Sequence, residues 1–237
     1  MGMWDDFEMP ASEGRRLPVY LLLDTSYSMN GAPIESLRSG LEQFKSEVMA
    51  DEISSDCVHV GVITFADDAE LVTGNLQLIE SFQPPTLTAA GVTRLDKAFQ
   101  VLRESVDRDL KRPIQGGKKG DYKPMIFVLT DGQPTDENGY ESDVLWPPER
   151  DALVNRPSGK IKPSNIVAVG CGPNCKDETL KGISTGIAFR MGTDKAAFVA
   201  LIQYLSMSIA CTLQAGNNPD DDSWNQISIS NGMTRIP

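Results

Sequence analysis

Four apolar segments rich in β-branched residues recur along the chain and predict buried strands. They are VYLLL (19–23), VHVGVITF (58–65), MIFVLT (125–130) and IVAVG (166–170). Each is almost continuously hydrophobic, as parallel strands covered on both faces must be. A shorter segment, ELVTGNL (70–76), follows its predecessor too closely for a crossover helix, and we expect an antiparallel edge strand there.

Helical periodicity separates these strands. Apolar residues of the segments 34–49, 95–106 and 197–209 recur at spacings of three and four, which places them along one side of a helix. Alternating strands and helices predict a doubly wound α/β fold, because each crossover packs back onto the sheet with the same hand. We therefore expect a mostly parallel sheet with one antiparallel edge strand and helices on both faces.

Two terminal segments show no such periodicity. Residues 1–15 predict a flexible N-terminal segment, and residues 214–237 predict a polar, disordered C-terminal tail that carries three consecutive aspartates, Asp220 to Asp222. Residues 16–213 would then form one folded domain. The long turn-rich segment 132–150 directly follows a predicted strand end, where long loops are often functional.

The net negative charge of the chain argues against two classes of partner. The 237 residues include 33 Asp and Glu against 22 Lys and Arg, a formal net charge of −11, and 40% are hydrophobic, which is enough for a core. Such a surface repels phosphate backbones and anionic lipids, so we expect neither nucleic acid nor a membrane as partner. The acidic start has no apolar central region, and no run of eighteen apolar residues occurs, so we expect a cytoplasmic protein.

The cysteines and the single histidine give weak signals. Cys57, Cys171, Cys175 and Cys211 form no dense framework, and the CGPNC segment supplies only two of the four ligands that structural zinc needs. We expect free thiols, and a strand position without catalytic role for His59.

Stronger signals stand at the predicted strand ends. DTSYS (24–28) follows the first strand, TDGQPTD (130–136) begins at the end of the third, and GVT (91–93) precedes the helical segment 95–106. Ligands of open α/β sheets bind at the carboxyl ends of the strands, so these motifs predict one shared crevice. The simpler alternative is that the hydroxyls and carboxylates of these motifs cap the following helices.

The oxygen atoms of this crevice suit a hard cation. The candidate ligands are two carboxylates and three hydroxyls: Asp24, Ser26, Ser28, Thr93 and Asp131. Alternate residues of an extended segment face one way, so the first three can approach a single point, and we expect Asp24 to lie at a solvent-facing strand end. An oxygen-only set predicts Mg²⁺, with Mn²⁺ or Ca²⁺ as alternatives.

These three motifs, in this order, resemble the metal-ion-dependent adhesion site of von Willebrand factor A domains, across roughly residues 17–212. The sequence is most similar to the bacterial tellurium-resistance-associated members of TerY type. The resemblance implies a Rossmann-like fold in which Ser26 and Ser28 bind the cation directly. It also implies that Thr93 binds directly or through water, and that Asp24 and Asp131 hold coordinating waters. One departure is GVT, where many members have a second glycine or a proline.

The resemblance further implies binding rather than catalysis. The cation would keep an open position for an Asp or Glu of a protein partner. The family also implies a cytoplasmic adaptor in a bacterial stress or tellurium-resistance system, with a kinase and a phosphatase encoded nearby as possible partners.

Two other functions are compatible with a strand that ends in aspartate. A magnesium-dependent phosphotransferase or phosphatase of the haloacid-dehalogenase type needs a second carboxylate two residues after the first, and that position is Ser26. A scaffold that has lost its metal would lack some of the five ligands, and all five are present. Neither a P-loop nor a G-x-S-x-G motif occurs, so we expect no enzyme.

Overall fold

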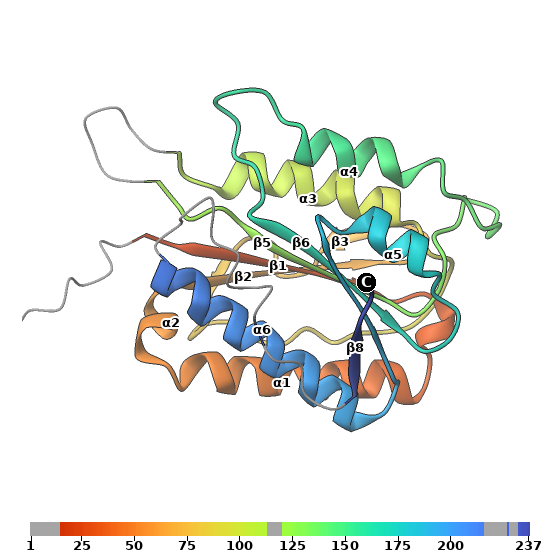
Figure 1. The fold of residues 1–237 in the computed structure, drawn as a ribbon, viewed down its shortest axis with the longest axis horizontal. Helices are drawn as coiled ribbons and strands as arrows, with labels where there is room; N and C mark the ends of the chain where they lie inside the picture. The colour runs from red at the N-terminus through yellow and green to blue at the C-terminus, as the bar shows by residue number, and fades with distance from the viewer. Residues whose placement is uncertain (1–14, 113–119, 216–226, 228–231) are drawn as a thin grey trace, which may run out of the picture.

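The computed structural model describes residues 15–112, 120–215, 227 and 232–237, which form a single mixed sheet between two layers of helices (Figure 1). The strand order is β3-β2-β1-β5-β6-β7-β8, with β4 also paired to β2. The parallel strands are β1 (Leu17–Asp24), β2 (Val58–Phe65), β5 (Met125–Thr130), β6 (Asn165–Cys171) and β7 (Ile187–Met191). The antiparallel strands are β3 (Ala69–Leu71), β4 (Gln77–Leu78) and β8 (Met233–Arg235).

Helices cover both faces of this sheet, as predicted. On one face lie α1 (Ala32–Met49), α2 (Glu52–Cys57) and α6 (Lys195–Ala215), and on the other α3 (Leu95–Asp109), α4 (Trp146–Val154) and α5 (Asp177–Ile183) (Figure 1). The predicted doubly wound α/β fold is confirmed. The expectation of one antiparallel edge strand is too simple, because β3 and β4 pair with β2 at one edge and β8 closes the other.

Helix α6 is the most apolar helix of the core. By length and composition alone it could cross a membrane, but 56% of its apolar window is buried inside the fold. Its Phe198, Leu201 and Leu205 pack into the same cluster as Leu37 and Leu41 of α1, against the strands. We therefore explain its hydrophobicity by its packing against both α1 and the sheet.

The prediction of a disordered tail is wrong for its last residues. Met233–Arg235 pair with β7 in antiparallel register, and the Ile236 N–H donates to the Ala188 carbonyl at 2.9 Å. Residues 1–14 and the aspartates 220–222, for which flexibility was also predicted, lie outside the described residues. At the other end of the chain, Arg15 Nε donates to the Gly120 carbonyl at 2.8 Å.

Gly40, inside α1, leaves a small gap beneath α6. A Cβ at this position would lie 3.7 Å from Ile202 Cδ1 and 3.8 Å from Phe198 Cδ1, both ordinary van der Waals distances. We predict that Gly40→Ala raises the free energy of unfolding by about 1 kcal/mol, because alanine stabilises a helix interior and here also fills space. Urea denaturation of the two proteins measures the difference.

Gly182 in α5 provides the matched control, since its Cβ would lie 2.9 Å from Trp146 Cη2. There the same substitution should fail to stabilise. If Gly40→Ala is destabilising instead, the contact between α1 and α6 is tighter than described.

Candidate metal centre

The pairing of β1 with β5 brings two of the polar motifs to one edge of the sheet. Leu23 is the register partner of Leu129, so Asp24 and Thr130 leave the sheet side by side. The Thr130 hydroxyl donates to Asp24 Oδ2 at 2.5 Å, and the Ser28 hydroxyl donates to Asp131 Oδ1 at 2.6 Å. These two hydrogen bonds tie the DTSYS segment to the TDG segment.

The chain turns sharply after Asp24. The Ser26 N–H donates to Asp24 Oδ1 at 2.8 Å, and the short helix η1 (Tyr27–Met29) follows at once. This turn brings Ser26 Oγ and Ser28 Oγ to 3.1 Å from each other. Four of the five predicted ligands, Asp24, Ser26, Ser28 and Asp131, therefore belong to one hydrogen-bonded group.

Thr93 lies in a loop held between the other two motifs. Its N–H donates to Thr135 Oγ1 at 2.9 Å, and its carbonyl accepts from the Thr135 N–H at 2.8 Å. The same loop donates from Ala90 N to the Thr25 carbonyl and accepts at the Gly91 carbonyl from Tyr27 N. Within the described residues the Thr93 hydroxyl makes no hydrogen bond to the other four side chains, so only its backbone is fixed beside them.

Helix capping does not explain these residues. The N-cap of α3 is Arg94 and that of α1 is Gly31, and neither makes a side-chain cap hydrogen bond. Ser26 is the N-cap of η1, also without one. The capping alternative is therefore wrong for Thr93 and for the hydroxyls of DTSYS.

The turn before Thr93 requires a glycine at one position. Gly91 has φ +78°, and a Cβ there would approach the Asp67 carboxylate to 2.5 Å. That carboxylate accepts the Val92 N–H at 2.9 Å. The left-handed residue of GVT is thus Gly91, and Val92 fills the following position with its N–H bonded to Asp67.

The two carboxylates are buried without a counter-charge. Asp24 is 0% exposed and Asp131 is 6% exposed, so the expectation of a solvent-facing Asp24 is wrong. Burial raises the pKa of Asp24 to about 6, against the hydrogen bonds from Ser26 and Thr130 that lower it, and the nearby Asp131 charge raises it further. Burial also raises the pKa of Asp131. Neither carboxylate forms an ion pair with any described residue.

This donor set fits a hard cation. Across the described parts of the chain no three His, Cys, Asp or Glu side chains lie close enough to hold a metal. A cation at this edge would therefore rely on hydroxyls together with the two carboxylates. Uncompensated carboxylates beside paired hydroxyls are the oxygen ligands that Mg²⁺, Mn²⁺ and Ca²⁺ accept.

Cys175 lies beneath the site as a neutral thiol. Its Sγ–H donates weakly to the Thr130 carbonyl at 3.4 Å, and burial raises its pKa to about 12. Burial also raises the pKa of Cys171. All four cysteines are free, which confirms that prediction.

The predicted strand position of His59 is also confirmed. Its Nδ1 lies 3.0 Å from the Cys57 carbonyl at the start of β2, at the opposite end of that strand from the carboxyl edge.

Sequence reasoning missed the residues that position this group. Thr130 directly precedes Asp131 and Thr135 follows it by four residues, so both were visible in TDGQPTD without an assigned role. Their roles depend on hydrogen bonds to Asp24 and to the Thr93 backbone. No local pattern signals either bond.

Comparison with known proteins identifies the fold. The model of the von Willebrand factor type A domain matches residues 19–203. No curated protein matches the sequence. Solved structures that resemble the chain include a von Willebrand factor type A protein from Catenulispora acidiphila, with TM-score 0.59 and 14% identity over 83% of this chain and 43% of that one.

Two further similar structures come from pili. The adhesin SpaC from Lactobacillus rhamnosus GG has TM-score 0.60 and 14% identity, over 84% of this chain and 31% of that one. The vWF domain of the type V pili tip protein Mfa5 from Porphyromonas gingivalis has TM-score 0.53 and 12% identity, over 83% and 97%. The chain thus spans less than half of the Catenulispora acidiphila protein and of SpaC. Identities this low show the fold alone.

The burial of Asp24 predicts a pH-dependent stability in the absence of metal. Its folded pKa of about 6 lies above the ordinary 3.8, so its charge destabilises the fold as pH rises through 6. We predict that Asp24→Asn, in chelator, raises the free energy of unfolding by about 3 kcal/mol near neutral pH. The gain should shrink as pH falls toward 4.

Denaturant unfolding at several pH values measures this difference. The exposed Asp56 supplies the control, and Asp56→Asn should show a small effect that does not change with pH. A gain for Asp24→Asn that is equal at all pH values would mean that the buried charge is not its cause.

Proposed function

The chain belongs to the von Willebrand factor type A domain family, and on that premise we propose that it is a metal-dependent protein–protein interaction module. Domains of this family commonly mediate protein–protein interaction or adhesion, and they are generally not enzymes. The observation that supports a metal here is the pair of buried carboxylates, Asp24 and Asp131, without a counter-charge.

Five residues would hold the cation. The hydroxyls of Ser26, Ser28 and Thr93 would face it, with Asp24 and Asp131 behind them. The Ser28 proton points to Asp131, which leaves oxygen lone pairs for a cation. When bound, Mg²⁺, or Mn²⁺ or Ca²⁺ in its place, supplies positive charge and an open position for an anionic oxygen.

Asp24 acts on this group through its neighbours. One carboxylate oxygen holds the Ser26 N–H and so fixes the turn, and the other holds Thr130 on the adjacent strand. Few negative side chains would contact the cation directly, so it would remain attractive to a partner's Asp or Glu.

Exposed apolar side chains around the site also suit a protein partner. Tyr27 is 71% exposed, and the loop after β5 presents Tyr140 at 73% and Val144 at 76%. This loop is ordered, because Asp136 Oδ1 accepts the N–H groups of Asn138 and Tyr140. Aromatic side chains on a fixed backbone are frequent anchors of protein interfaces.

The biological setting follows from the resemblance to TerY-type proteins. We propose a cytoplasmic adaptor of a bacterial stress or tellurium-resistance system, with a kinase and a phosphatase encoded nearby as candidate partners. The phosphotransferase alternative lacks support, because Ser26 occupies the position where that chemistry needs a carboxylate, and its hydroxyl pairs with Ser28.

Cation binding should raise thermal stability. We predict that Mg²⁺ or Mn²⁺ at a hundredfold excess over its dissociation constant stabilises the wild-type protein by about 2.7 kcal/mol, because the unfolded chain has no assembled site. Thermal unfolding during a metal titration measures this shift. Ser28→Ala and Asp24→Asn should abolish it.

His59→Ala is the control, since His59 bonds to the Cys57 carbonyl at the opposite end of β2, and it should respond to metal as the wild type does. A wild-type shift in both Ser28→Ala and Asp24→Asn would place any bound cation elsewhere.

Partner binding should depend on the metal. We predict that proteins captured by the immobilised wild-type chain in Mg²⁺ are lost in chelator and with Ser28→Ala, but are retained by His59→Ala. Quantitative comparison of the captured proteins measures this, and moderate salt should weaken capture only slightly, because a metal-bridged carboxylate is a short-range contact. Capture that survives chelator would show that the interaction uses another face.

A further inference from the structure

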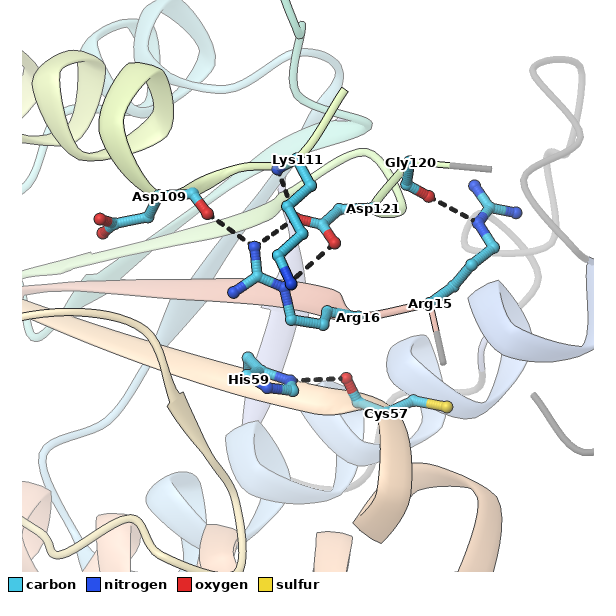
Figure 2. A network of polar contacts seen from close by, with 8 residues as sticks. All are labelled: Arg15, Arg16, Cys57, His59, Asp109, Lys111, Gly120 and Asp121. Atoms are coloured by element: carbon cyan, nitrogen blue, oxygen red, sulfur yellow. Dashed lines mark hydrogen bonds and ion pairs between the residues drawn. The ribbon is translucent and has the colours of Figure 1, made fainter. Parts of the chain in front are cut away.

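The end of the sheet opposite the candidate metal centre concentrates positive charge. Four segments meet where β1, β5 and β6 begin: residues 15–16, 107–112, 120–124 and 156–164. Backbone hydrogen bonds join them, from Asp121 N to the Lys111 carbonyl, from Tyr122 N to the Arg16 carbonyl and from Ser164 N to the Pro124 carbonyl. We call this surface the basic pole. Figure 2 shows part of it, with Arg15, Arg16 and Lys111 beside Asp109 and Asp121.

The described residues of the basic pole include nine basic and three acidic side chains. The basic ones are Arg15, Arg16, Arg108, Lys111, Arg112, Lys123, Arg156, Lys160 and Lys162, and the acidic ones are Asp107, Asp109 and Asp121. The whole chain has a formal charge of −11. This excess of positive charge is therefore local, and it faces away from the candidate metal centre.

The three acidic residues are already paired within the pole. Asp121, 3% exposed in its side chain, accepts from Arg16 Nη2 at 2.5 Å and from the Lys111 N–H at 2.7 Å. Asp109 pairs with Arg108 at 2.7 Å (Figure 2 shows its backbone carbonyl bonded to Arg16).

Asp107 accepts from both Arg156 and Lys160, each at 3.2 Å. These pairs hold the pole together and leave its other cations for an external ligand.

Four exposed cations of the pole make no ion pair within the described parts of the chain: Lys111, Arg112, Lys123 and Lys162. Lys123 and Lys162 precede neighbouring strands, β5 and β6, which lie about 4.8 Å apart in a sheet. Arg112 follows Lys111, whose backbone bonds to Asp121. The cations without an ion pair thus lie on adjacent segments at the amino-terminal ends of the parallel strands.

From this arrangement we propose that the basic pole binds a short acidic segment of a partner protein. Several cations on adjacent segments match successive carboxylates of an extended chain, which advances about 3.3 Å per residue. A long nucleic acid fits less well, because α2 borders the pole at the start of β2 with exposed Glu52 and Asp56, and the rest of the chain repels phosphates.

The distance between the two ends makes this surface independent of the metal. Strand β1 has 8 residues, and eight residues of strand extend about 26 Å, well beyond the Debye length of about 8 Å at physiological salt. One partner could therefore occupy the metal edge while another occupies the basic pole, which is what an adaptor requires.

Fluorescence anisotropy with a labelled oligoglutamate peptide tests the proposal, at low salt and in chelator, so that the metal centre takes no part. The double variant Lys123→Glu/Lys162→Glu should bind the peptide about tenfold more weakly than the wild type. Both lysines are exposed, so folding should be unaffected. The matched control is Lys181→Glu/Lys195→Glu, which changes the net charge equally at exposed positions outside the pole.

The control should retain wild-type affinity within a factor of about two. Equal losses in both variants would reduce the effect to net charge and overturn the proposal. An oligonucleotide of equal charge that binds as tightly as the peptide would overturn the choice of a protein segment. Self-association of the wild type that the pole variant abolishes would reassign the pole to contacts between copies of the chain.

Discussion

The carboxyl edge of this fold depends on one buried carboxylate. Asp24 is fully enclosed, and its two oxygens bind a backbone N–H on its own segment and a hydroxyl on the neighbouring strand. The first bond forms the turn that aligns Ser26 with Ser28, and the second couples β1 to the segment that carries Asp131. Removing the Asp24 charge would make the fold more stable, but the site would lose the carboxylate that holds its turn and its neighbouring strand in place. Buried carboxylates without a counter-charge are electrostatically unfavourable, and such an arrangement is compatible with a bound cation.

The parallel sheet makes this arrangement possible. β1 and β5 are adjacent although about a hundred residues separate them, so their polar ends meet without any local sequence signal of contact. The Thr93 loop then enters from the chain after β4 and is fixed by bonds to both segments. Hydrogen bonds thus join the three segments DTSYS, GVT and TDG at one edge of the sheet, and they fix the backbone that carries the candidate ligands.

The sequence predicts much of this because residue type and strand position carry the signal. Continuous apolar runs identified β1, β2, β5 and β6. The oxygens that follow β1 and β5 identified four of the five candidate ligands, and the GVT motif before α3 identified Thr93. Strand β7 was missed because it has only five residues, one of them Arg190, and β8 has only three. Their formation depends on pairing with each other and with β6. The burial of Asp24 was also missed, because it results from how the loops close over the strand end.

Strand β8 has a consequence for behaviour in solution. β7 would otherwise be the last strand of the sheet, with Phe189 and Met191 on a row of unpaired N–H and C=O groups. Such an open edge is a template for pairing with other chains and so promotes aggregation. Met233–Arg235 pair with β7 and take its place as the edge strand. Because β8 has only three residues, it offers other chains a much shorter edge to pair with than β7 would.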